Sequence, residues 1–283
     1  GFHSPHPPYG SGPYWMDRID PESITLPPAE RVEHPAMRFM RITKGIPENV
    51  EDETIHRIRH TYCAMVAEVD EQIGRILEQL QTSGLADRTL VVFFSDHGDM
   101  QMEHGQSRKC SLYQGPVRVP PIPSGPGFAA GEVHEEPVSL LDLVPTLRAA
   151  TGLPEDGEAD GLNLAAASSN PERPIIAQYH DCMQPTGSFM LRAGPWKLID
   201  YIGMDPQLFH LEEDPDEIDD RSRREGERCR SLRRQLRSLL DVEAIDRAAK
   251  EHDLQCFRTW RSLCGRAGSR EILRRVFPDI TDG

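Results

Sequence analysis

The sequence TLVVFFSDHGD, residues 89–99, begins as an apolar run and ends abruptly in polar side chains. The run is rich in β-branched and aromatic residues and does not alternate with polar ones, which is typical of a strand buried on both faces. Such strands occur in parallel α/β sheets, and open α/β sheets bind ligands just beyond the carboxyl ends of their strands. The stretch therefore predicts an α/β fold with a ligand site at Asp96 and His97.

Two predicted helices flank this strand along the chain. Within residues 52–80 apolar side chains recur at steps of three and four, the first turn is acidic, and Gly84 supplies a stop signal. Beyond a loop rich in Gly and Pro, residues 138–151 predict a second amphipathic helix, with a kink at Pro145. Helices on either side of a buried strand favour part of a large, mostly parallel sheet flanked by helices.

The C-terminal half has a different pattern, of short strands joined by turns. The four predicted strands are Ile175–Tyr179, Ser188–Ala193, Trp196–Ile202 and Gln207–Leu211. Gly194 and Pro195 predict a hairpin turn, and a charged helix is expected from about residue 221 to 240. We therefore expect a smaller antiparallel sheet with a packed helix. The expected parts of the chain are residues 1–153 (α/β domain), 154–174 (linker), 175–245 (small α+β subdomain) and 246–283 (tail of unknown role).

Composition and charge narrow the classes of partner. The chain has 283 residues, of which 37% are hydrophobic and 28% charged, the mix of a globular protein rather than a disordered one. A net charge of −14 argues against a nucleic acid or an anionic membrane as partner, although a local cationic pocket can still bind an anionic substrate. No apolar run approaches the ~20 residues that span a bilayer. The six cysteines lack a C-x-x-C pair, which argues against a structural zinc site.

Four side chains are candidates for chemistry. Asp96 and His97 offer an oxygen and a nitrogen to a cation, although an Asp-His pair in a loop is more often a hydrogen-bonded turn. Only four of the 32 lysines and arginines are lysines, which suggests that Lys109 lies at a site requiring a compact ammonium group. The alternative is that Lys109 is a solvated surface lysine. His6 is flanked by prolines that restrict its backbone, although a histidine in such a loop is usually just exposed.

A longer set of motifs resembles the sulfatase family. The central match consists of S-D-H-G-D-M-x-x-E-H-G, then Lys109, S-L-Y-Q-G-P-V-R-V-P and S-G-P-G. The opening F-H-S-P-H-P-P-Y resembles the family's x-H-x-P-H-x-P-F loop, and V-S-L-L-D-L-V-P-T-L resembles a family helix. R-A-G-P-W-K-L-I-D-Y and P-Q-L-F-H-L-E-E-D-P-D-E resemble its C-terminal hairpin and the segment after it. These matches follow the family's order from residue 2 to about residue 245, which is far more specific than any single motif.

The resemblance implies a role for each candidate. Asp96 and His97 become ligands of a divalent metal, with calcium favoured and manganese or magnesium as alternatives. Lys109 becomes the cation that binds the sulfate and stabilises charge on the leaving oxygen, and His6 becomes a sulfate contact that acts in acid–base transfer. The implied function is metal-dependent hydrolysis of a sulfate ester carried by a small molecule or a saccharide. Residues 1–153 then form the C-terminal part of the sulfatase catalytic α/β domain.

The chain also departs from the family pattern. Family members attack sulfur through a formylglycine made from the cysteine or serine of an early C/S-x-P/A-x-R motif, and no cysteine here fits that motif. The one literal serine match, residues 169–173, follows the metal motif instead of preceding it, so we reject it. The family's early Asp-Asp pair of metal ligands is missing too. We therefore expect the nucleophile in a missing N-terminal part of the same protein, and this chain alone to be inactive.

Smaller departures follow Lys109. The family usually has an apolar strand after R-V-P, whereas Pro121 and Pro123 remove hydrogen-bond donors there and should shorten that strand. Gln114 replaces the usual glutamate, which we expect to change a local hydrogen bond.

Two alternative functions stay open. A phosphonate monoester or phosphodiester hydrolase of the same alkaline-phosphatase-like superfamily would share the scaffold and the Asp-His pair, because a sulfate ester and a phosphate diester are both tetrahedral and singly charged. A non-catalytic sulfatase-like fragment would retain the fold without the chemistry.

Overall fold

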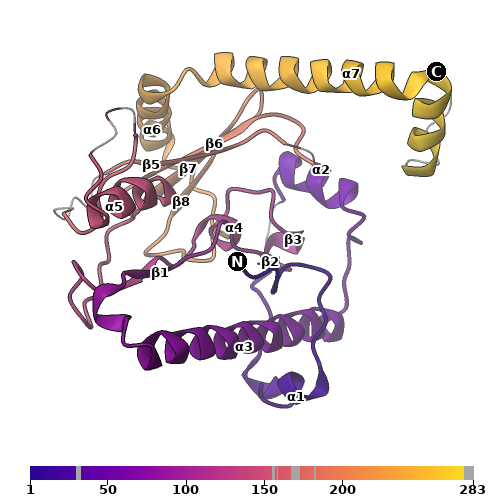
Figure 1. Cartoon of the computed structure of the whole chain (residues 1–283). Coiled ribbons are helices and arrows are strands. Elements are labelled where there is room, and N and C mark those ends of the chain that lie inside the picture. Colours follow the sequence, from indigo (N-terminus) through magenta and orange to yellow (C-terminus); the bar gives the residue numbers. More distant parts are fainter. Residues whose placement is uncertain (30–32, 155–156, 158, 167–172, 182, 277–283) are drawn as a thin grey trace. The chain divides into compact units, whose positions relative to one another are not determined.

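A computed structural model describes residues 1–29, 33–154, 157, 159–166, 173–181 and 183–276. The chain divides into two compact units, residues 1–233 and 234–283, and the division lies inside a helix. The domain limits expected from the sequence therefore stay a prediction. The fold of the first unit is mixed α/β and includes a four-stranded antiparallel sheet (Figure 1).

Helices dominate the first 90 residues, which contain α1 (Pro13–Met16), α2 (Pro35–Thr43), α3 (Asp52–Thr82) and the 3-10 turns η1 (Pro21–Ser23) and η2 (Ala86–Arg88). The long helix α3 confirms the periodicity of residues 52–80, and Gly84 follows its end in the left-handed conformation (φ 69°). Helix α2 was not among the expected elements, although its buried residues Ala36, Met37 and Met40 follow a helical spacing. Its start is defined by Pro35 in the first turn and by the His34 side chain, which accepts a hydrogen bond from the Ala36 amide.

The predicted buried strand forms only a narrow ribbon. Strand β1 (Val91–Phe93) pairs antiparallel with β4 (Ile122–Ser124), and Val92 lies opposite Pro123. Proline donates no ladder hydrogen bond, which agrees with the expected shortening of that strand. Within the described ranges β1 has no parallel neighbour, so the large parallel sheet is not shown. A local apolar run indicates a buried strand, but which strand pairs with it, and whether in parallel or antiparallel, depends on distant segments.

Short elements connect this ribbon to the following helix. They are β2 (Met100–Gln101), η3 (Glu103–Gly105), β3 (Ser107–Arg108), α4 (Gln114–Val117), η4 (Leu140–Asp142) and α5 (Leu143–Ala150). The helix expected over residues 138–151 is divided into η4 and α5, with Ser139 as a capping-box residue. Pro145 lies in the first turn of α5, where an amide would have no helical acceptor. The change from 3-10 to α-helix just before it stands where the sequence predicted a kink.

The C-terminal sheet agrees with the sequence pattern. Its strands are β5 (Ile175–Tyr179), β6 (Ser188–Ala193), β7 (Trp196–Tyr201) and β8 (Gln207–His210), all antiparallel in the order β5-β6-β7-β8. Strands β6 and β7 form the expected hairpin, in which Ala193 pairs with Trp196. Strands β7 and β8 each end one residue earlier than expected. Of the predicted linker 154–174, the stretches 155–156, 158 and 167–172 lie outside the described residues.

The two faces of this sheet pack against different partners. One face buries Met190, Ile199 and Phe209 in a cluster with Met37 of α2 and Met100 of β2. The cluster also contains Leu112 and Tyr113 from the loop after β3, so the sheet packs against the segments that follow β1 and β3. On strand β7 the alternate residue Asp200 forms an ion pair with Arg233 at 3.0 Å, which joins the other face to α6 (Gly226–Leu239).

The second unit consists mainly of α7 (Val242–Val276), which includes most of the tail to which the sequence gave no role. Gly265 has a non-helical backbone (φ 69°, ψ 164°) and divides this helix into two. Helix α6 begins five residues later than the expected 221. None of the described helices is both long and apolar enough to cross a bilayer. The five described cysteines form no disulfide, and Cys182 lies outside the described residues.

Candidate active site

The loop after β1 is held by its own backbone and by α4. The Ser95 hydroxyl donates to the His97 carbonyl (2.7 Å), and the His97 amide donates to the Asp96 carboxylate (3.0 Å). The Gly98 amide donates to the Pro116 carbonyl at 2.7 Å. A Cβ atom on Gly98 would lie 2.0 Å from the carbonyl oxygen of Gly115, so this position accepts only glycine. The glycine therefore lets the Asp-His loop pack directly on the backbone of α4.

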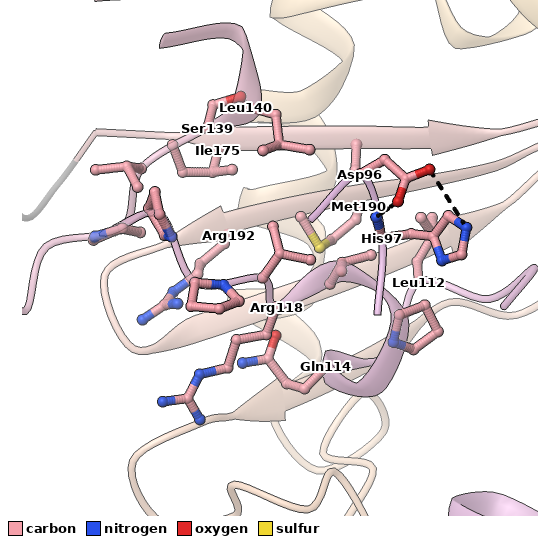
Figure 2. A pocket seen from close by; sticks show the side chains of 18 of the residues that line it. Asp96, His97, Leu112, Gln114, Arg118, Ser139, Leu140, Ile175, Met190 and Arg192 are labelled. Atoms are coloured by element: carbon pink, nitrogen blue, oxygen red, sulfur yellow. Dashed lines mark hydrogen bonds and ion pairs between the residues drawn. The ribbon is translucent and has the colours of Figure 1, made fainter. Parts of the chain in front are cut away.

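Lys109 and His97 lie in direct contact. The His97 Nδ1 atom is 2.8 Å from the Gly98 carbonyl, which assigns the proton to Nδ1 and the lone pair to Nε2. The Lys109 ammonium donates to that Nε2 at 2.9 Å, and an Asp96 carboxylate oxygen lies 3.7 Å from the same nitrogen. Figure 2 shows Asp96 and His97 on one side of the cavity and Arg118 and Arg192 on the other.

His6 reaches the same place from the N-terminal segment. Its ring centroid is 6.5 Å from that of His97 and 4.9 Å from that of His3. Its Nδ1 lies 2.7 Å from the Pro7 carbonyl and donates to it, which leaves Nε2 for another partner. His6, Asp96, His97 and Lys109 all line one cavity of about 1480 Å³. The structure thus brings together all four residues that the sequence singled out.

A tyrosine ties the N-terminal segment to the Asp-His loop. The Tyr9 hydroxyl donates to Asp99 at 2.9 Å and accepts from the Gln101 side chain at 3.1 Å. Burial raises the pKa of Asp99 above its ordinary value, although the Tyr9 hydrogen bond opposes this. Burial, and then the Asp99 charge, raise the pKa of Tyr9 far above its usual range. The sequence gave neither residue a role, since only the fold brings positions 9 and 99 together.

Asp96 and His97 fit a metal ion as two ligands of a larger shell. The Asp96 side chain is 84% exposed, so its oxygens are accessible, and one of them lies 3.7 Å from the His97 Nε2 atom, whose lone pair accepts from Lys109 in this structure. Divalent ions take four ligands in zinc sites and six to eight in calcium sites. No group of three or more His, Cys, Asp or Glu side chains in the described part of the chain could hold a metal ion. This chain therefore offers part of a shell.

Comparison with solved structures defines the class of fold. The phosphonate monoester hydrolase of Agrobacterium radiobacter is 24% identical, with a TM-score of 0.67 over 86% of this chain and 55% of that one. The enzyme from Silicibacter pomeroyi is also 24% identical, with a TM-score of 0.68 over 89% and 54%. BT4656, in complex with its substrate D-glucosamine-2-N,6-O-disulfate, is 23% identical, with a TM-score of 0.56 over 77% and 46%. These likenesses show a fold of the sulfatase and phosphonate hydrolase class.

Sequence comparison defines the family. The model of the family described as Sulfatase matches residues 2–153, and the chain belongs to this family. Arylsulfatase K of Danio rerio is 31% identical over 277 residues, which are 93% of this chain and 53% of the relative. Arylsulfatase K of Homo sapiens is 31% identical over 276 residues, which are 92% and 51%. The chain therefore spans about half the length of these curated relatives.

Proposed function

We propose that this chain carries the sulfate-binding wall, and part of the metal site, of a sulfuric ester hydrolase whose substrate is a sulfate ester of a small molecule or a saccharide. One observation carries the proposal: Asp96, His97 and Lys109 line a single cavity together with His6 from the distant N-terminal segment, and Lys109 contacts His97 there at 2.9 Å. The family match supports it, as does the disulfated sugar bound by one structural neighbour.

Lys109 and His6 have separate tasks in this proposal. Negative charge grows on the leaving oxygen as the sulfur–oxygen bond breaks. The Lys109 ammonium binds a sulfate oxygen and stabilises that charge. His6 acts in its imidazolium form: the Nδ1 proton stays on the Pro7 carbonyl, and the Nε2 proton passes to the leaving oxygen, which leaves a neutral imidazole. General-acid assistance of this kind is worth roughly 10²–10⁴-fold in rate.

Asp96 and His97 would hold a divalent ion, with calcium as the first candidate and manganese or magnesium as alternatives. When bound, such an ion offsets negative charge on the sulfate. The sulfatase family generally uses a divalent metal. Since two ligands make up only part of a shell, the chain alone should bind calcium or manganese weakly. Calorimetry measures this, and tight binding that Asp96→Ala abolishes would contradict the partial shell.

The nucleophile and the other metal ligands are proposed to lie in an N-terminal part of the same protein, because this chain has no C/S-x-P/A-x-R motif ahead of its metal motif. That part would join residues 1–153 in one catalytic domain and complete the parallel sheet beside β1. Residues 154–174 would then be a linker, 175–245 a small subdomain and 246–283 a tail. This chain by itself would be inactive.

A phosphonate monoester or phosphodiester hydrolase is the second candidate. The observation that favours it is the fold likeness to two phosphonate monoester hydrolases, with TM-scores of 0.67 and 0.68. A sulfate ester and a phosphonate monoester present the same tetrahedral, singly charged group to Lys109, so the residues of this wall suit both.

Two measurements test the proposal. Inorganic sulfate titrated into the chain should bind, and Lys109→Ala should weaken this binding whereas Lys250→Ala, a control in the second unit, should not. The chain joined to its proposed N-terminal part should then hydrolyse an aryl sulfate with a higher kcat/KM than an aryl phosphonate monoester. The reverse preference would favour the second candidate. If sulfate does not bind and neither ester is hydrolysed, the chain is a non-catalytic sulfatase-like fragment.

A further inference from the structure

A second lysine supports the loop that presents Lys109. Lys44 follows directly after α2, and its ammonium donates to the carbonyl oxygens of Ser107 (2.6 Å) and of Lys109 itself (2.9 Å). The two lysines are 65 residues apart in the chain. Lys44 is half-buried and lines the same cavity as Lys109. Charge-assisted hydrogen bonds of this kind are about twice as strong as neutral ones.

Helix α2 is a fixed base for this contact. Its residues Ala36, Met37 and Met40 are fully buried in the cluster beneath the sheet. The fully buried Gln106 side chain donates to the Met37 carbonyl at 2.9 Å, so α2 holds the loop at a second point. Because α2 is packed in the core on one side and hydrogen-bonded to the loop on the other, it can hold the backbone of Lys109 in one position.

The backbone around Lys109 needs such a restraint. Arg108 and Cys110, the neighbours on either side, have φ angles of 65° and 88° in the left-handed region that favours glycine. A non-glycine residue in this region is strained and persists only where its surroundings hold the backbone in place. The Lys44 ammonium binds the carbonyls on both sides of Arg108, which is where this restraint is required.

We propose that Lys44 is a positioning residue for Lys109. It fixes the 107–109 backbone against α2 and so sets the direction in which the Lys109 side chain enters the cavity towards His97. The proposal rests on the proposed function, in which Lys109 binds the sulfate. Lys44 acts through Lys109 and need not touch the substrate.

The small number of lysines allows a direct test. The chain has four lysines, so a sample labelled with ¹³C only at lysine gives four Cε signals, one for each site. Inorganic sulfate should shift the Lys109 signal of the unmodified chain. In Lys44→Met the Lys109 signal should differ already without sulfate, and the Kd for sulfate should rise by roughly tenfold or more, as for other supporting residues. Lys44→Arg should restore part of the affinity, because its guanidinium also donates to two acceptors.

One reference signal and one control variant separate positioning from unfolding. Lys197 is fully buried, so its signal reports the core, and Lys250→Met in the second unit is the matched control. If Lys44→Met disturbs the Lys197 signal, Lys44→Gln, which retains an N–H donor, takes its place. An unchanged Lys109 signal together with an unchanged Kd in the folded variant would overturn the proposal. If sulfate leaves the Lys109 signal of the unmodified chain unmoved, the proposed function fails, and the sulfate-free Lys109 signal still decides the role of Lys44.

Discussion

The β1–β4 ribbon and the β5–β8 sheet both follow from apolar runs in the sequence, but their environments differ. In the sheet, Leu191, Leu198 and Leu208 are fully buried. In and just after the ribbon strand β1, Phe93 and Phe94 are 38% and 47% exposed. The sheet is closed by successive antiparallel pairs within residues 175–210, whereas the ribbon joins segments about 30 residues apart. The sheet is therefore the firm part of the molecule.

The comparison explains how the site is supported. The ribbon brings Asp96 and His97 into place but contributes little burial, so contacts from elsewhere fix the loops: Tyr9 on Asp99 and Lys44 on the Lys109 backbone. The sheet adds a contact from below, where Lys197 of β7 contacts Gln114 at the start of α4. Contacts from the sheet and from α2 thus hold the loops of the site in place.

The largest effect is expected at Lys197. This lysine is fully buried and pairs with Glu217 at 2.7 Å, while burial lowers its pKa and Glu217 opposes that shift. Lys197→Met leaves the Glu217 charge buried without its main partner. The free energy of unfolding should fall by about 3–5 kcal/mol, measured by urea unfolding followed by circular dichroism.

The control for Lys197 is Lys250, whose ammonium pairs with Asp246 while its side chain is 55% exposed. Lys250→Met should change the unfolding free energy by less than about 1 kcal/mol. Adding Glu217→Gln to Lys197→Met should recover part of the loss, since no buried charge then stays unpaired. Equal losses in the two lysine variants would mean that the sheet does not depend on its buried pair.

The next effect compares the two regions directly. Leu198→Ala, in the fully buried centre of β7, should lower the free energy of unfolding by about 2–5 kcal/mol. Phe94→Ala, just after β1, removes a larger side chain that is 47% exposed, and its cost should stay below about 1 kcal/mol. The same urea titration measures both variants. A larger loss for Phe94→Ala would show that the ribbon is the better packed region.

The smallest effect concerns an ion pair between η4, which follows the ribbon along the chain, and the segment just ahead of the sheet. Asp142 of η4 binds Arg173, which lies just ahead of β5, through two hydrogen bonds of 2.7 and 2.8 Å. Burial alone raises the pKa of Asp142, but the hydrogen bonds from Arg173 and from the Leu162 and Ser139 amides outweigh it and bring the pKa below its ordinary value. Stability from this carboxylate is therefore complete above its unfolded pKa of about 3.9 and is lost as pH falls through the folded value.

Asp142→Asn tests this linkage. Relative to the unmodified chain, the variant should be less stable near neutral pH. The difference should shrink as the pH falls below about 4, where Asp142 is protonated first in the unfolded chain and, at lower pH, in the folded one. Thermal unfolding over a pH series measures the difference. A difference that stays constant over the series would show that Asp142 acts through its shape rather than its charge.

Much of the fold could be predicted because its signals are local. The 3- and 4-residue spacing in residues 52–80 predicts α3 to within a few residues, since a helix satisfies its hydrogen bonds within itself. The β6–β7 hairpin follows from two runs and the turn at Gly194. Helix α2 was not predicted, because it is short and its apolar positions Ala36, Met37 and Met40 give only a brief periodic signal.

The sequence predicted the residues of the candidate site but not the residues that support them. The scarcity of lysines singled out Lys109, and the same signal applied to Lys44 and Lys197, which also have specific contacts. Nothing in the sequence separated these two from the exposed Lys250, because their partners are 20 to 83 residues away. Asp99 stands inside the D-H-G-D motif, yet its contact with Tyr9 spans 90 positions.

By itself the sequence determined the helix α3, the C-terminal strands and the family, and it singled out four residues that line one cavity, because periodicity and motif order depend only on neighbours along the chain. Only the tertiary structure decided which strand pairs with β1, how Tyr9 engages Asp99, and how Lys44 holds the backbone of Lys109. These contacts join segments 30 to 90 residues apart. Their partners are chosen when the chain closes such loops and buries its core, and no local pattern encodes that choice.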